Sequence, residues 1–225
     1  MVEPTNHPAR DEWERMLSGE LYVADSPQQQ EANMRKRRLV QAINTSEYDA
    51  FKERDELFHE LFGAFGEGGF VEPPFNCDYG CNTFIGKNFY ANMDCIFLDV
   101  ARITIGDRVN IQDGSVLHTL YQKSVIEIRN DVSVGHNAII HGAVIGDNCL
   151  IGMGATLLDN AHIPSGCIIA ANALVLSNAQ LEPNSVYAGV PAKKVKEVTE
   201  EQREEIIRRT ARDYMLYASW YKEDE

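Results

Sequence analysis

The chain has 225 residues, five cysteines and a formal net charge of −13 at pH 7. Such acidity argues against nucleic acid and anionic membrane surfaces as partners, because both are themselves negatively charged. The sequence contains no run of 18 apolar residues and opens with no signal peptide, so we expect a cytoplasmic protein with no membrane partner.

The first part of the chain, from residue 8 to about residue 65, is predicted to be helical. Apolar residues such as Met34, Leu39 and Ile43 recur there at helical spacing. The glycine-rich segment 63–69 ends the helical pattern, and Pro73-Pro74 opens an extended region. We therefore divide the chain into an N-terminal helical region (1–70), a β-rich body (71–197) and a C-terminal helix (198–225).

The β-rich body is marked by aliphatic residues that recur every six positions. A period of six fits neither an α-helix nor a simple strand alternation, and it is typical of a parallel β-helix whose triangular coils contain three hexads each. The anchors are Ile105, Ile111, Leu117, Ile128, Val134, Ile140, Ile145, Ile151, Leu157, Ile163, Ile169, Val175 and Leu181.

Two other positions of the hexad support the same frame. Three residues after an anchor the chain carries Gly, Asn or Asp, which tolerate the left-handed backbone of a corner. Four residues after an anchor it carries small residues, as the interior of a narrow prism requires; Cys95, Cys149 and Cys167 fall in this slot.

The body is expected to end at residues 189–192, where the sequence reads Gly-Val-Pro-Ala. Thr199 and Gln202 then have the spacing of a capping box, so we predict a final helix that runs to about Tyr221.

The hexad frame places three histidines in informative positions. His118 and His141 each follow the third anchor of their coil, so they share one slot on one face, one coil apart. Coils stack at about 4.8 Å, which allows two imidazoles to lean onto one metal ion. His136 lies on the second face and could join such a site only from a neighbouring subunit. The pattern thus predicts a homotrimer with a metal site between subunits, and a solvated polar face is the simpler alternative.

From about residue 110 onward the chain resembles the γ-class carbonic anhydrases. The matching segments are 110–114, 116–118, 135–138, 141–142, 152–155 and 189–193. The resemblance implies a left-handed β-helix, a trimer and a catalytic zinc or iron ion held by His118, His136 and His141. It also implies that Gln112, Asp113 and Asp99 assist catalysis. Phe97 stands where these anhydrases carry an arginine.

Residues 12 to about 109 instead resemble the maltose and galactoside O-acetyltransferases, which share the left-handed β-helix and the trimer. The matching segments are 16–22, 75–80, 88–92 and 98–102. This resemblance implies acetyl-CoA as cosubstrate, Asp25, Tyr90 and Asn92 as acceptor-binding residues, and Lys193 and Lys194 as contacts to CoA phosphates. The loop that bears the catalytic histidine of these transferases is missing after His118.

Three functions follow from these patterns. The first is hydration of carbon dioxide by a metal-bound hydroxide at a trimer interface. The second is acetyl-CoA-dependent O-acetylation of a sugar, with His118 or His136 as the general base. The third is a non-catalytic, metal-binding β-helix trimer, because a fold alone does not establish an activity.

Overall fold

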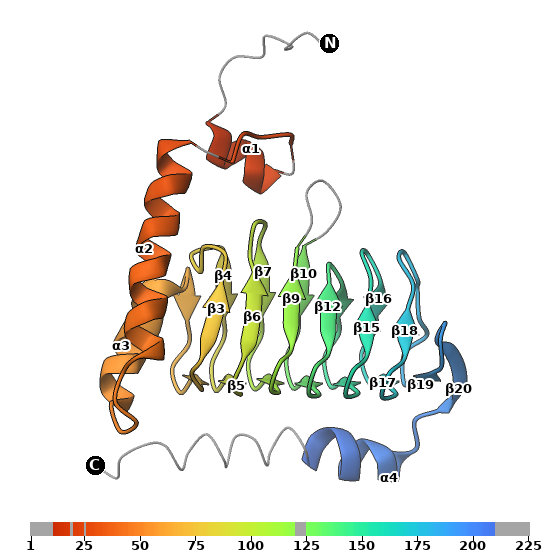
Figure 1. The fold of residues 1–225 in the computed structure, drawn as a ribbon. Coiled ribbons are helices and arrows are strands. Elements are labelled where there is room, and N and C mark those ends of the chain that lie inside the picture. The colour runs from red at the N-terminus through yellow and green to blue at the C-terminus, as the bar shows by residue number, and fades with distance from the viewer. Residues whose placement is uncertain (1–10, 19, 25, 120–124, 210–225) are drawn as a thin grey trace, which may run out of the picture.

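The computed structural model describes residues 11–18, 20–24, 26–119 and 125–209. Its body is a parallel β-helix, with helices at both ends of the chain (Figure 1). The predicted fold of hexapeptide-repeat coils with an N-terminal helical region is therefore confirmed. The end of the predicted last helix, at about Tyr221, lies outside the described residues.

The N-terminal region contains α1 (Glu12–Ser18), α2 (Pro27–Asn44) and α3 (Phe51–Leu61). Ser26 and Gln29 form a capping box at the start of α2, and Pro27 occupies its first turn. At the other end of α2, the Asn44 side chain bonds both the N–H and the C=O of Phe75, each at 2.9 Å. This pair of bonds fixes the helical region on the first coils.

Within the described residues the strands form three sheets, one for each side of the prism. Sheet A contains β1 (Ala64–Phe65), β4 (Thr83–Ile85), β7 (Ile103–Ile105), β10 (Ile126–Ile128), β13 (Val144–Ile145) and β16 (His162–Ile163). Sheet C contains β3 (Phe75–Cys77), β6 (Cys95–Leu98), β9 (Val116–His118), β12 (Ile139–His141), β15 (Thr156–Leu157) and β18 (Leu174–Val175).

Sheet B faces the C-terminal segment. It contains β2 (Phe70–Val71), β5 (Tyr90–Ala91), β8 (Asn110–Ile111), β11 (Ser133–Val134), β14 (Leu150–Ile151), β17 (Ile168–Ile169), β19 (Ser185–Ala188) and β20 (Lys193–Glu197). All neighbours pair in parallel except β19 and β20, which are antiparallel. The chain then continues into α4 (Glu200–Gln202) and a π-helical turn, η1 (Arg203–Arg208).

The interior of the prism follows the hexad frame. The described anchors from Ile105 to Val175 are at most 2 % exposed, and the small residues four positions later fill the space between them. At the N-terminal end, where no hexad anchor was assigned, the rings of Phe58, Phe62, Phe65 and Phe75 pack against one another. Aromatic packing thus closes the end of the prism that the helices cover (Figure 1).

The predicted corner residues adopt the left-handed backbone. Each has a positive φ, between 55° and 76° for residues such as Asn137 and Gly166. Arg108 also has a positive φ, of 54°, which its residue type did not suggest. Its guanidinium bonds both oxygens of Asp131 in the next coil, at 2.7 and 2.8 Å, and this ion pair accompanies the unusual backbone.

Candidate functional site

His118 and His141 lie side by side at the ends of β9 and β12. The two residues are direct partners in sheet C, and their ring centroids are 4.8 Å apart. The predicted one-coil stacking of these side chains is therefore observed. Burial lowers the pKa of His118, and the neighbouring His141 lowers it further, because two cationic rings would repel each other. Burial and His141 thus both favour the neutral form of His118.

Asp159 is the residue that orients His141. Its Oδ1 lies 3.1 Å from Nδ1 of His141, and the two side chains are only 18 % and 23 % exposed. Sequence reasoning did not single out Asp159. The available signal was its place in the coil after His141, two residues beyond the anchor Leu157.

Asp78 of the first coils and Tyr22 of the N-terminal region lie near the same corner of the prism. Asp78 follows β3, and its carboxylate raises the pKa of His118, opposing the effects of burial and His141. Burial raises the pKa of Asp78 itself, while Lys36 on α2 lowers it. Tyr22 lies near enough to Asp78 for its pKa to be raised by that charge in addition to burial. We call His118, His141, Asp159 and Asp78 the sheet C corner.

Trp13 of α1 covers part of this region. Its ring meets the Tyr79 ring edge-on, with centroids 5.1 Å apart. Burial, followed by the nearby Tyr22 and Asp78, raises the pKa of Tyr79 to about 12, so this phenol remains protonated. Trp13 thus packs α1 against the coil segment that follows Asp78.

His136 belongs to a different group of side chains, beside sheet B. Its Nδ1 lies 2.6 Å from Oδ2 of Asp113, and the Asn92 amide donates to the same oxygen at 3.1 Å. Nε2, the second ring nitrogen of His136, lies on the side of the ring away from Asp113. A carboxylate bonded to Nδ1 is the usual device for fixing the tautomer of a histidine and stabilising its protonated form.

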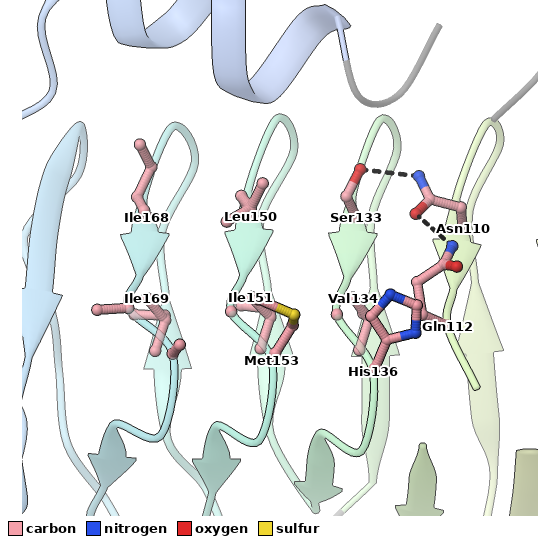
Figure 2. A pocket seen from close by; sticks show the side chains of 14 residues that line it. Asn110, Gln112, Ser133, Val134, His136, Leu150, Ile151, Met153, Ile168 and Ile169 are labelled. Carbon is pink, nitrogen blue, oxygen red and sulfur yellow. Dashed lines mark hydrogen bonds between the residues drawn. The ribbon is translucent and has the colours of Figure 1, made fainter. Parts of the chain in front are cut away.

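We call His136 and Asp113 the His136 dyad. A series of hydrogen-bonded polar side chains runs next to it. The Gln112 amide donates to Oδ1 of Asn110 at 3.2 Å, and the Asn110 amide donates to Oγ of Ser133 at 2.8 Å. All three side chains are nearly buried. Figure 2 shows this series at one end of a groove, with His136 beside Gln112.

The groove has a volume of about 310 Å³ and runs along sheet B beneath the C-terminal segment (Figure 2). Ile207 of η1 packs with Val198 and Ile168, which sets that segment against the sheet. Beyond the polar end the lining is mostly apolar, with Leu150, Ile151, Met153, Ile168, Ile169, Ala170 and Ala171. An elongated, largely apolar ligand fits this space, with its polar end at His136.

Asp99 does not face either histidine group through its carboxylate. Its Oδ1 accepts hydrogen bonds from the N–H groups of Tyr79 and Gly80, and its Oδ2 accepts from Asn82 N–H and the Thr83 hydroxyl. Burial raises the pKa of Asp99 to about 6, although these hydrogen bonds act in the opposite direction. Asp99 orders the chain segment that carries Tyr79, and a catalytic role for it stays a prediction.

Phe97 fills the position where an arginine was expected by resemblance. Its side chain is fully buried and meets Phe75 edge-on at 5.1 Å. The position therefore serves the aromatic packing at this end of the prism.

The other predicted binding residues are distributed as follows. Asp25 lies outside the described residues, whereas Tyr90 and Asn92 lie on or just after β5, with Asn92 bonded to Asp113. Lys193 and Lys194 are exposed on β20. Lys194 is engaged by the carboxylates of Glu182 and Glu197, so Lys193 is the more available cation of the two.

The structure does not bring the three histidines together within one chain. Among the described residues, no group of three or more His, Cys, Asp or Glu side chains could hold a metal ion. His118 and His141 supply two adjacent imidazoles, so a third ligand such as His136 would have to come from a second copy. In the part of the chain that is described, no helix is long and apolar enough to span a membrane.

Comparisons with known proteins place the chain in a family. Residues 15–66 match the maltose acetyltransferase hexapeptide capping motif, and residues 126–159 match the bacterial transferase hexapeptide repeat model. The galactoside O-acetyltransferase of Escherichia coli is 30 % identical over 204 residues, which span 84 % of this chain and 91 % of that protein. The chain belongs to the hexapeptide-repeat acetyltransferases, and the protein is an enzyme.

Two further likenesses are informative. An acetyltransferase from Vibrio cholerae, solved with acetyl-CoA, is similar with a TM-score of 0.63 and 28 % identity, covering 85 % of this chain and all of that chain. A carbonic anhydrase from Geobacillus kaustophilus is 50 % identical over 124 residues, or 55 % of this chain and 67 % of that protein. Similarity along nearly the whole chain therefore favours the acetyltransferases, whereas the anhydrase likeness is confined to one part. Neither these comparisons nor the structure supports zinc or iron as a cofactor.

Proposed function

We propose that this protein transfers the acetyl group of acetyl-CoA to a hydroxyl group of a sugar. The observation that carries the proposal is the 2.6 Å contact between Asp113 and Nδ1 of His136 at the polar end of the apolar groove. The similar acetyltransferase from Vibrio cholerae, solved with acetyl-CoA, supports the same cosubstrate here.

The dyad accounts for the proton transfers. Nε2 of His136 takes the proton from the acceptor hydroxyl as its oxygen attacks the thioester carbonyl carbon. Asp113 holds Nδ1–H and stabilises the imidazolium that forms. When the tetrahedral intermediate collapses, the C–S bond breaks and the CoA sulfur leaves with the proton from Nε2, so the ester and the free thiol are the products.

The groove accounts for the binding of the cosubstrate. Its apolar walls suit the thin pantetheine arm of acetyl-CoA, which would place the thioester at the polar end beside His136. Lys193 on β20 is the cation that we assign to a CoA phosphate, because Lys194 is occupied by Glu182 and Glu197.

A trimer would complete the site. If sheet B of one subunit faces sheet C of the next, the sheet C corner of the neighbour meets the groove. The neutral His118 and the acidic Asp78 would then lie on the acceptor side of His136. Tyr90, Asn92 and Asp25 remain our proposed contacts to the acceptor.

The test measures the release of free CoA from acetyl-CoA in the presence of galactosides and of maltose. A thiol reagent detects the free CoA. His136→Gln is expected to lower kcat by about 10²–10⁴-fold, the usual contribution of a general base. Asp113→Asn should lower kcat with little change in the KM for acetyl-CoA, because Asp113 acts through His136. His162→Gln, which changes an exposed histidine on sheet A, serves as the control. Full activity in His136→Gln would refute the assignment of the base.

Carbon dioxide hydration is the second candidate, because the carbonic anhydrase is 50 % identical over 124 residues, and the resemblance to that class implies His118, His136 and His141 as metal ligands. A zinc or iron ion held by these histidines would supply an ionised water at neutral pH. Measuring the metal content of the purified protein and its hydration rate separates the two functions. Stoichiometric metal that His141→Ala removes, together with hydration activity, would favour the anhydrase. Metal-free protein that consumes acetyl-CoA would favour the transferase.

A further inference from the structure

A second cavity lies farther along the prism from the groove. It has a volume of about 300 Å³, and we call it the distal cavity. Its walls come from the turn between α2 and α3, the start of α3, and the corners that follow β2 and β5. The lining residues are Ser46, Tyr48, Phe51, Arg54, Glu72, Pro73 and Met93.

The distal cavity is connected to the His136 dyad by successive corners of the prism. Met93 in its wall follows Asn92, whose amide donates to Asp113 at 3.1 Å, and Asp113 in turn contacts His136. At about 4.8 Å per coil, the coil of Met93 lies ~10 Å from the coil of His136. A single pyranose ring whose hydroxyl meets His136 would not fill the distal cavity, so the cavity is available to a second ring.

A row of aromatic rings leads from the cavity along sheet B. Tyr48 meets Phe51 at 6.3 Å, Phe51 meets Phe70 at 6.2 Å, and Phe70 stacks on Tyr90 at 6.2 Å with an interplanar angle of 10°. Tyr90 is paired in the sheet with Asn110 of the groove. Packing in the protein accounts for the aromatic side chains of Phe51, Phe70 and Tyr90. It does not account for an aromatic side chain at Tyr48, which is 83 % exposed.

Arg54 fixes the backbone of the turn that carries Tyr48. Its guanidinium is buried and donates to the Ser46 hydroxyl at 3.1 Å and to the carbonyl oxygens of Glu47 at 2.6 Å and Tyr48 at 2.8 Å. The same group lies over the Phe51 ring, 5.1 Å from its centroid. The turn is therefore fixed before a ligand arrives, which reduces the entropy lost when the ligand binds.

The chemistry of the lining selects the ligand. An exposed tyrosine ring packs against the C–H face of a sugar. The Ser46 hydroxyl already donates to the Ile43 carbonyl oxygen and accepts from Arg54, so the ring of Tyr48 is the contact that we assign to the ligand. The Glu72 carboxylate and the net charge of −13 disfavour an anionic ligand. We propose that the distal cavity is a second acceptor subsite, so that the preferred acceptor is an oligosaccharide whose next sugar ring rests on Tyr48. This inference rests on the proposed sugar acetylation.

The test compares glucose, maltose and maltotriose in two measurements. Binding is measured by isothermal titration without acetyl-CoA, and kcat/KM is measured with it. We expect maltotriose to bind more tightly than glucose. Tyr48→Ala should weaken maltotriose about tenfold and leave glucose unchanged, and Tyr48→Phe, which keeps the ring, should restore most of the preference.

The outcomes separate the subsite from the transfer reaction. If maltotriose binds through Tyr48 but no acetyl group is transferred, the subsite stands and the proposed function fails. If glucose and maltotriose are acetylated with equal kcat/KM in the parent and in Tyr48→Ala, the proposed function stands and the subsite is refuted. Absence of binding to all three sugars, or equal weakening of all three by Tyr48→Ala, also refutes the subsite.

Discussion

At the scale of single residues, Asp99 illustrates a buried carboxylate whose contribution to stability depends on pH. Burial raises its pKa from 3.8 to about 6. Between these values the folded carboxyl keeps a proton that the unfolded chain has released, so stability falls as pH rises from about 4 to about 6 and is level above that. A shift of this size corresponds to about 3 kcal/mol at neutral pH.

Asp99→Asn is expected to remove this pH dependence. The variant should also be less stable at every pH, by about 1–3 kcal/mol, because the amide presents N–H groups where the carboxylate accepted hydrogen bonds from the backbone. Urea denaturation of both proteins at several pH values measures the effect. A parent whose stability rises between pH 4 and 6, relative to the variant, would contradict the expectation.

His118 gives a second prediction at this scale. Burial and His141 both lower its pKa, so its titration by NMR should be centred below the ordinary value of 6.5. In His141→Gln the neighbouring cation can no longer form, and we expect the pKa of His118 to rise while burial still holds it below the ordinary value. His162→Gln is the matched control and should leave His118 unchanged. An unchanged pKa in His141→Gln would mean that the two rings are not coupled.

At the scale of elements, close contact between coils limits which residues can occupy their corners. A Cβ added at Gly152 would lie 2.5 Å from the Ala171 nitrogen and 2.6 Å from the Ala170 carbonyl carbon, both of them backbone atoms of the next coil. Relief of this clash requires the two coils to move apart, which would disturb the pairing of β14 with β17.

Gly152→Ala should therefore destabilise the protein by about 1–3 kcal/mol, the range typical of overpacked sites. The neighbouring Met153→Ala, at a side chain that is 57 % exposed, should cost much less. Thermal or urea unfolding of the two variants compares them directly. Equal stability of Gly152→Ala and the parent would show that the coils can separate at no cost.

At the scale of the whole molecule, the two histidine groups lie on different sheets of one prism, so a shared site requires two subunits. If the proposed trimer forms, His136→Ala and His118→Ala should each be strongly impaired as pure oligomers. When the two are mixed in equal amounts, unfolded and refolded together, about one quarter of the interfaces should combine an intact His136 with an intact His118. Activity should return to about that fraction of the parent value.

Sedimentation of the refolded mixture must give the same trimer as the parent, which serves as the control. Mixed trimers with no activity, or a fully active pure His118→Ala trimer, would exclude a site shared in this way. The second result would leave the His136 dyad as a site within one chain.

The local features of the candidate site were predictable where the repeat dictates them. The hexad period placed His118 and His141 in adjacent coils, as observed. The Gly, Asn and Asp residues at the corners predicted the left-handed backbone that Asn137 and Gly166 adopt. Each of these follows from a rule that is satisfied within one or two coils, because parallel pairing fixes the register of every following coil. The capping box that was predicted at Thr199 is likewise local in sequence and is observed.

Tertiary structure alone decided what surrounds the histidines. Tyr22, which follows α1, lies near Asp78 of the sheet C corner only because the N-terminal helices pack on the first coils, and Ile207 packs on Ile168 only because the C-terminal segment crosses sheet B. These contacts join segments that share no period, and their side chains follow no repeat that sequence could reveal. The sequence by itself therefore determined the prism and the placement of its histidines, whereas the packing of the N-terminal helices and the C-terminal segment determined which further side chains lie near them.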